Sequence, residues 1–205
     1  MAFGIAAVSD LFRSVEKKMQ ENRDLIIELD SRLGDGDLGL TMTGAFAAAA
    51  ALSPGDEKDI GKYLAKAGLA MNNAAPSTMG TLMASGFMRG GKALRGVEEI
   101  FLDGLRSFFH AFLEGLMERG KSVRGEKTII DVIGPVSDSF DIEYPDMATA
   151  LNAALETAEA GPDATKDMLA CRGRAAYYQE QSLGHQDPGA TAGLFLVQGF
   201  AEVFG

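Results

Sequence analysis

The sequence predicts an all-α protein, a single bundle of about eight helices with short connections. Apolar residues recur at steps of three and four along most of the chain, which is the spacing of one face of an amphipathic helix. No segment shows the alternation of apolar and polar residues that is typical of a strand, and we find no linker or internal repeat. The 205 residues, of which 46% are hydrophobic, are enough for one domain with a full-sized core.

The apolar pattern places the helical segments one after another along the chain. A phenylalanine-rich stripe marks the longest of them, and a run of alanines from Ala47 to Ala51 gives another a strong helix propensity with little bulk. Gly134-Pro135 is expected to interrupt the seventh segment. The predicted segments are 5–19, 22–33, 40–52, 60–69, 78–94, 97–119, 128–136, 147–158, 164–181 and 190–204.

An acidic, glycine-rich turn stands between the second and third of these segments. Asp30, Asp35 and Asp37 are separated by glycines that can take positive φ, so the backbone can fold the three side chains toward one point. Three clustered carboxylates repel one another unless a cation lies between them, and hard oxygen ligands select Mg²⁺ or Ca²⁺. The turn therefore indicates a divalent-metal site.

Other interpretations of this turn differ in strength. An EF-hand is rejected, because the twelfth position counted from Asp35 is Phe46 and the third counted from Asp30 is Arg32. Residues 34–39 match the dinucleotide-binding pattern G-x-G-x-x-G, but the two aspartates inside it would repel a pyrophosphate. A plain acidic turn between two helices is the interpretation that remains beside the metal site. The residues of the turn alone do not favour one of these two interpretations over the other.

Composition excludes several classes of partner. The net charge of −10 would repel nucleic acid rather than attract it. The single cysteine, Cys171, cannot form an internal disulfide and suits a reducing compartment. The N-terminus lacks the basic region of a signal peptide, and no apolar run is long enough for a membrane span. We therefore expect a cytoplasmic protein that binds neither nucleic acid nor membrane.

Two further loops could contribute to a site. Residues 115–122 satisfy the Walker A expression, but they complete a helix instead of following a strand, so a P-loop is rejected. The loop 120–128 could still place amides and a cation near a nucleotide, although a basic surface turn is equally compatible. Arg174 offers a guanidinium suited to phosphate, and Asp187-Pro188-Gly189 would put a carboxylate and free amides at a helix N-terminus. His110 is expected to be a partly exposed helix residue and not a ligand.

Taken together, these motifs resemble the ADP-binding L subunit of dihydroxyacetone kinases, the DhaL family. The resemblance spans nearly the whole chain in the family's order, and its motifs are specific as a set. The matching pieces are Asp30 with Gly34-Asp35-Gly36-Asp37 and Gly39, Thr78-Met79-Gly80, Gly120 with Gly125-Glu126-Lys127-Thr128 and Asp131, and Arg172-Gly173-Arg174 with the stretch 184–190.

The resemblance implies an antiparallel eight-helix barrel, one nucleotide-binding domain over residues 1–205, with ADP or ATP bound at one end. By position, Asp30, Asp35 and Asp37 would hold two Mg²⁺ ions that bridge the nucleotide phosphates. The residues that would surround the nucleotide are Leu38, Gly39, Leu40, Thr41, Thr78, Met79, Gly80, Gly120, Ile129, Arg174, Asp187, Pro188 and Gly189.

The implied activity is a phosphotransferase of the glycerone kinase type, active only with a separate K subunit that binds a short-chain ketose. The phosphoryl donor would be ATP in one branch of the family and a phosphotransferase-system subunit in the other, and a homodimer is compatible with this reading. Leu38 and Met79 stand where the family usually has histidine and serine. The loss of these two polar contacts motivates an alternative, a nucleotide-sensing regulatory module without kinase activity. A structural copy that binds neither metal nor nucleotide is the third reading.

Overall fold

The computed structural model describes residues 2–205, and its secondary structure is almost entirely helical. None of the helices in this range is both long and apolar enough to cross a lipid bilayer. The α-helices are α1 (Ile5–Glu21), α2 (Arg23–Leu33), α3 (Leu38–Ala50), α4 (Ile60–Ala74), α5 (Thr78–Ala93), α6 (Leu102–Gly120), α7 (Ile130–Ser139), α8 (Met147–Ala164) and α9 (Pro188–Phe204). Two 3₁₀ segments, η1 (Thr165–Asp167) and η2 (Ala175–Ser182), and two short strands, β1 (Phe3–Gly4) and β2 (Glu99–Ile100), complete the list.

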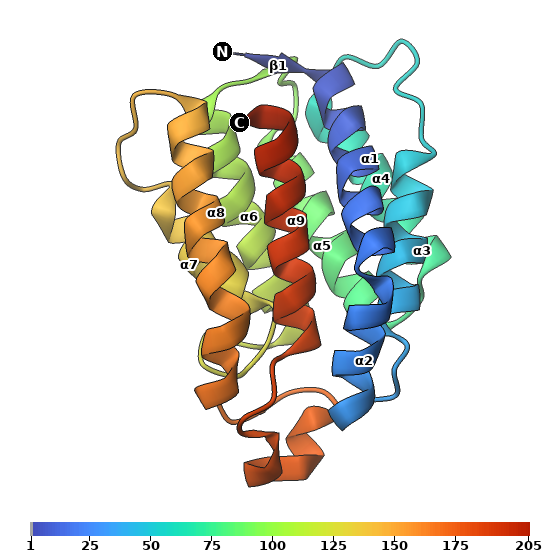
Figure 1. Cartoon of the computed structure of the whole chain (residues 1–205). Helices are drawn as coiled ribbons and strands as arrows, with labels where there is room; N and C mark the ends of the chain where they lie inside the picture. The colour runs from blue at the N-terminus through green and yellow to red at the C-terminus, as the bar shows by residue number, and fades with distance from the viewer. Residues whose placement is uncertain (1) are drawn as a thin grey trace.

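Eight of the helices close into a ring. Helix α1 packs beside α3, each helix from α3 to α8 packs beside the next, and α9 returns to α1 (Figure 1). The short helix α2 continues α1 past Asn22 and packs against α3 at the end of the barrel that lies opposite the two chain termini (Figure 1). The predictions of an all-α fold and of an eight-helix barrel are confirmed.

The interior of the barrel is built around five aromatic side chains from the four helices α1, α3, α5 and α6. Phe87 lies at its centre, and its ring is 5.2 Å from the rings of both Phe12 and Phe112 and about 6 Å from those of Phe46 and Phe108. All five side chains are almost completely buried. Because each buried aromatic residue removes a large apolar area from water, this cluster supplies a major part of the folding free energy.

Helices α4 and α5 approach each other closely because glycines stand at their crossing. A Cβ atom on Gly91 would lie 2.6 Å from the carbonyl oxygen of Gly61, and 3.1 Å from the amide nitrogen of Ala65. Gly44, in the middle of α3, presents the opposite case, because a Cβ atom there would meet nothing within 4 Å. Substitution by alanine should therefore destabilise the fold at Gly91 and stabilise it at Gly44.

Two predicted helix boundaries are wrong. The segment predicted from residue 97 begins its helix only at Leu102, because Glu99 and Ile100 pair with Gly4 and Phe3 in a small antiparallel ladder. Helix α7 is not interrupted at Gly134-Pro135 but continues to Ser139. The reason lies outside the helix. The guanidinium of Arg124 donates to the carbonyl oxygen of Gly134 and to both carboxylate oxygens of Asp138, so it fastens the turns on either side of the proline.

The predicted helix over 164–181 is also wrong. Helix α8 takes the first residue, running through Pro162 to Ala164, and the chain then continues as η1, an extended stretch and the irregular η2. Gly173 (φ 64°) and Gln179 (φ 49°) have left-handed backbone conformations, which an α-helix cannot contain. This segment lies across the end of the barrel beside α2 (Figure 1).

We expect opposite stability changes from alanine at the two glycines. Gly44→Ala should raise the free energy of unfolding by about 1 kcal/mol, because alanine has the higher helix propensity and its methyl group meets no neighbour. Gly91→Ala should lower it by about 2 kcal/mol, because α4 and α5 must move apart. Urea unfolding followed by circular dichroism measures both. A gain in stability from Gly91→Ala would contradict the close crossing of α4 and α5.

Candidate functional site

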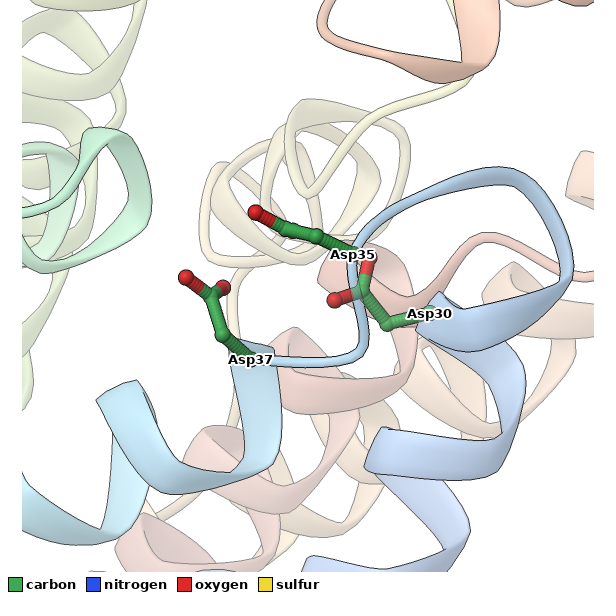
Figure 2. Close-up of side chains that lie close together, drawn as sticks. All are labelled: Asp30, Asp35 and Asp37. Atoms are coloured by element: carbon green, nitrogen blue, oxygen red, sulfur yellow. The ribbon is translucent and has the colours of Figure 1, made fainter.

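The three aspartates of the acidic turn lie together at one end of the barrel. Asp30 is in the last turn of α2, Asp35 is in the connection, and Asp37 immediately precedes α3. One carboxylate oxygen from each lies within 4.8 Å of the corresponding oxygens of the other two. Figure 2 shows the three carboxylate groups gathered on the same side of the turn. The sequence prediction that the turn brings these groups to one point agrees with this geometry.

Glycines make this arrangement sterically accessible. A Cβ atom on Gly34 would collide with the side chain of Asp30, and Gly36 has φ +72°, where a Cβ atom would lie 2.5 Å from the hydroxyl of Ser31. Asp37 is the residue before α3, but its carboxylate accepts no hydrogen bond from the first turn of that helix. The corresponding aspartates before α4, α8 and α9 all do accept one. The carboxylate of Asp37 is thus left available to the cluster.

The electrostatics of the cluster favour a bound cation. Burial raises the pKa of Asp30, and the nearby carboxylates of Asp35 and Asp37 raise this pKa further, while the amide of Leu38 donates to Asp30 over 3.2 Å and opposes the shift. The guanidinium of Arg174 lies 2.5 Å from the carboxylate of Asp35. Three converging oxygen ligands with unfavourable mutual repulsion are a donor set that fits Mg²⁺ or Ca²⁺.

The cluster opens into a cavity of about 510 Å³ between the end of the barrel and the segment that precedes α9. This volume is in the range of small-molecule sites. Of the residues expected from the sequence around a nucleotide, eight line it in addition to the three aspartates. They are Leu38, Thr78, Met79, Ile129, Arg174, Asp187, Pro188 and Gly189.

Four helices begin at this cavity. Helices α3, α5 and α9 start at Leu38, Thr78 and Pro188, which line it, and α7 starts directly after the lining residue Ile129. The first amides of a helix have no acceptor within the helix and carry the positive end of its dipole. Because alternate helices of an antiparallel barrel start at the same end, the topology brings these four termini together. The cavity is therefore suited to anions although the chain carries a net charge of −10.

Five predicted residues in the described part of the chain do not line the cavity. Gly39 packs against the backbone of Arg23, and Leu40 is exposed on the outer face of α3. The others lie behind the lining residues: Thr41 in the first turn of α3, Gly80 where its amide donates to Ser77, and Gly120 where it packs on Leu82.

Sequence reasoning missed several lining residues. Lys127 and Thr128 belong to a loop that was considered, but neither was selected as a site residue. Pro76, Ser77 and Leu82 flank the predicted Thr78-Met79-Gly80 and could have been found by extending that motif to the helix cap. Arg172 lies beside Arg174, and the structure assigns it to a bidentate ion pair with Glu126.

Asp187 has an unusual environment. It caps α9 by accepting from the amide of Ala190 over 2.7 Å. Burial raises the pKa of Asp187 to about 7 against the opposing effect of that amide, and the negative charge of Asp131 adds to the rise. Nearby Lys127 acts in the opposite direction and favours the carboxylate. A carboxyl group that titrates near neutral pH therefore borders the cavity.

A serine, a histidine and an aspartate also meet elsewhere, but they do not form a nucleophilic site. The ring of His110 bonds to Ser137 through Nδ1 and to Asp141 through Nε2, each over 2.9 Å. The hydroxyl of Ser137 is completely buried between α6 and α7, so no substrate can reach it. His110 is partly exposed on α6, as predicted, and its bonds tie two helices together.

Comparison with known proteins identifies the family. The DAK2 domain matches residues 32–202. This chain belongs to the DAK2 domain family. Two curated relatives are the ADP-binding subunit DhaL of the PEP-dependent dihydroxyacetone kinase of Escherichia coli K12, 35% identical over 83% of each chain, and its counterpart from kinase 1 of Listeria innocua, 36% identical over 88% of this chain and 87% of the relative. The predicted membership of the DhaL family is confirmed.

The fold also matches a solved structure. The crystal structure of the dihydroxyacetone kinase from C. freundii in complex with AMP-PNP and Mg²⁺ superimposes with a TM-score of 0.73 over 96% of this chain. The sequence identity is 23%, so this likeness concerns the fold alone. This chain spans about a third (34%) of the length of that kinase.

The raised pKa of Asp187 predicts how stability depends on pH. A carboxyl group that holds its proton more tightly in the folded chain than in the unfolded chain destabilises the fold when it ionises. The free energy of unfolding should therefore fall as the pH rises from 3.8 to about 7. Asp187→Asn keeps a cap for α9 and removes this charge. Its free energy of unfolding at pH 8 should exceed that of the wild type by about 2 kcal/mol, roughly half of the full linkage value, because the carboxylate borders an open cavity.

The gain should disappear at pH 4, and urea denaturation at the two pH values measures it. Asp146→Asn is the matched control, because Asp146 caps α8 in the same way but its pKa is lowered by the amide and hydroxyl of Thr149. The control should lose stability at pH 8. If the free energy of unfolding depends on pH in the same way in both variants, burial does not raise the pKa of Asp187.

Proposed function

We propose that this chain is the nucleotide-binding subunit of a dihydroxyacetone-type kinase, with residues 1–205 acting as one domain. It binds ADP or ATP with Mg²⁺ and passes a phosphoryl group to a short-chain ketose that a separate K-type subunit holds. The observation that carries the proposal is the meeting of three carboxylates and four helix N-termini at one cavity. The ADP-binding role of the two DhaL relatives supports the same assignment.

The metal sites are assigned to the acidic turn. Asp30, Asp35 and Asp37 would hold two Mg²⁺ ions, and the ions would neutralise the charge of the phosphate oxygens during transfer. The glycine turn holds the three carboxylates in position before any ligand arrives, so binding requires little reorganisation of the chain.

The phosphates are assigned to the helix starts. The amides around Leu38, Gly39 and Leu40, the hydroxyl of Thr41, and the stretch Thr78-Met79-Gly80 would contact them from α3 and α5. Arg174, whose guanidinium lies beside Asp35, would add a positive charge from the segment that precedes α9. The remaining wall of the nucleotide site is assigned to Ile129, Asp187, Pro188 and Gly189, with Gly120 behind the lining residue Leu82.

The partners follow from what phosphoryl transfer needs. The chemistry asks mainly for positioning and charge neutralisation, and the groups at the cavity supply both. Activation of the ketose hydroxyl is assigned to the K-type subunit. The two DhaL relatives are named as subunits of PEP-dependent kinases, which supports a phosphotransferase-system subunit as the phosphoryl donor. The free, exposed thiol of Cys171 suits the reducing conditions of the cytoplasm.

A regulatory module without kinase activity is the second candidate. Its support is that Leu38 and Met79 both line the cavity, so the two apolar replacements noted in the sequence border the proposed phosphate site directly. Such a module would bind nucleotide and metal and report their presence to a partner without transferring a phosphoryl group.

Loss of one carboxylate should weaken nucleotide binding that depends on magnesium. In calorimetry with ADP and Mg²⁺, Asp35→Asn should bind at least tenfold more weakly than the wild type, because the isosteric amide removes a negative ligand from the cluster. Asp24→Asn is the control, because Asp24 is an exposed aspartate on α2 outside the cavity. Wild-type affinity in Asp35→Asn would remove the metal assignment.

A transfer assay separates the two candidate functions. With a K-type subunit, dihydroxyacetone and either ATP or a phosphorylated phosphotransferase-system subunit, the chain should form the ketose phosphate, and Asp35→Asn should not. Mass spectrometry of the product measures the transfer. Tight ADP binding without turnover under either donor would favour the regulatory module.

A further inference from the structure

The segment 168–184, which we call the strap, carries two arginines to the cavity. It runs from the end of η1 through η2 to the turn before α9 and crosses the end of the barrel, where it is drawn in orange (Figure 1). Arg172, Gly173, Arg174 and Ala175 from this strap line the cavity, and Arg174 reaches Asp35. The position of the proposed phosphate-binding guanidinium therefore depends on what fixes the strap.

Apolar packing does not fix it. Four of the five large apolar or aromatic side chains of the strap are exposed, with Tyr177 the most exposed at 88%, and the fifth, Met168, is half-buried. The other exposed ones are Leu169, Tyr178 and Leu183. Within the strap, the fully enclosed side chains are the small ones of Ala170 and Ser182. A segment with so few buried apolar contacts would open locally unless polar contacts hold it.

Hydrogen bonds and ion pairs hold the strap instead. They include the bidentate ion pair of Arg172 with Glu126, and two hydrogen bonds come from Lys127. This residue is only 3% exposed and lies in the loop before α7 with φ +61°, a left-handed conformation that is unfavourable for lysine. Its Nζ donates to the carbonyl oxygen of Ser182 over 2.5 Å and to that of Met168 over 3.2 Å. One buried ammonium therefore joins the two ends of the strap, which are 14 residues apart in the sequence.

The surroundings of Lys127 support this arrangement from both sides. On the loop side, the carboxylate of Asp131 accepts from the amides of Gly125 and Thr128, which fixes the turn that contains Lys127. On the strap side, the hydroxyl of Ser182 accepts from the amide of Ala170 over 3.0 Å. The two carbonyls that Lys127 uses thus belong to two chain segments that also hydrogen-bond to each other.

We propose that Lys127 is a positioning residue that holds the strap closed and thereby sets the place of Arg174 at the cavity; its consequence for the reaction rests on the proposed function. A buried ammonium has lost its water shell, and among residues 2–205 its hydrogen bonds go to these two carbonyls, so opening the strap breaks both bonds. The charges of Asp187 and Asp167 favour the charged form of Lys127, although burial lowers its pKa. The strap is in this way fixed before a nucleotide arrives.

Limited proteolysis tests the proposal without any ligand. Trypsin cleaves after arginine, and Arg172 and Arg174 lie in the strap, so cleavage there reports local opening. Lys127→Met keeps the aliphatic stem and removes the donors. Cleavage after these two arginines should become at least tenfold faster than in the wild type, as expected for losing a charge-assisted hydrogen bond. Lys121→Met is the matched control, because Lys121 is an exposed lysine of the same loop outside the cavity, and it should cleave at the wild-type rate.

Cleavage of Lys127→Met at the wild-type rate would overturn the proposal. So would a lower melting temperature with no selective cleavage in the strap, because that is the pattern of a purely structural lysine. If Lys127→Met does not fold, hydrogen exchange on the wild type replaces it. The amides of Ala170, Cys171 and Gly184, which donate within the closed strap base, should then be protected without nucleotide. Exchange at the rate of an unstructured chain would overturn the proposal.

The functional consequence is measured separately. With ADP and Mg²⁺, Lys127→Met should bind about tenfold more weakly, while Lys127→Arg, which keeps a cation and its donors, should recover most of the affinity. Unchanged affinity in a variant whose strap opens would overturn the role of Lys127 in placing Arg174. Absence of ADP binding in the wild type would instead overturn the proposed function, and the proteolysis result would stand.

Discussion

The structure depends on holding three like charges together. Asp30, Asp35 and Asp37 repel one another, and burial makes the charge on Asp30 still less favourable. An unconstrained turn would splay these side chains into solvent. Here the last turn of α2 and the first turn of α3 fix the two ends of the turn, and the glycines between them allow the backbone path that brings the carboxylates together. The repulsion is therefore stored in the folded chain, and a cation is the group that relieves it.

The barrel topology solves a second electrostatic problem. A chain with a net charge of −10 repels a polyphosphate at long range, and the acidic turn strengthens that repulsion locally. The antiparallel arrangement offsets this effect, because α3, α5, α7 and α9 all direct their N-termini at the cavity. These partial charges belong to the backbone, so they do not change with pH and require no basic side chains. The strap adds the guanidinium of Arg174 where side-chain charge is needed.

The sequence predicts those parts of this structure that local periodicity determines. The stripes of apolar residues locate the helices, and the glycine and aspartate spacing of residues 34–39 identifies the turn, because both signals reside within a few consecutive residues. Local periodicity does not predict the path of the strap. Its local composition favours a helix, but its path is set by the ammonium of Lys127, which is 41 residues before Met168 in the chain. Likewise, Pro135 fails to end α7 because Arg124, eleven positions earlier, supports the helix from outside.

The barrel and the strap are therefore stabilised by different kinds of interaction. The barrel is held by an aromatic core around Phe87, whose burial contributes free energy through area and needs no particular hydrogen bond. The strap has almost no buried apolar surface and is held by a few directional contacts at its base. Apolar packing keeps the carboxylates and helix starts in place whether or not a ligand is bound. Directional contacts are lost one at a time, so the strap is the part of the cavity wall that can open without disturbing the rest. Under the proposed function, the carboxylates and helix starts stay rigid while the strap with Arg174 is the wall that opens for a nucleotide to enter or leave.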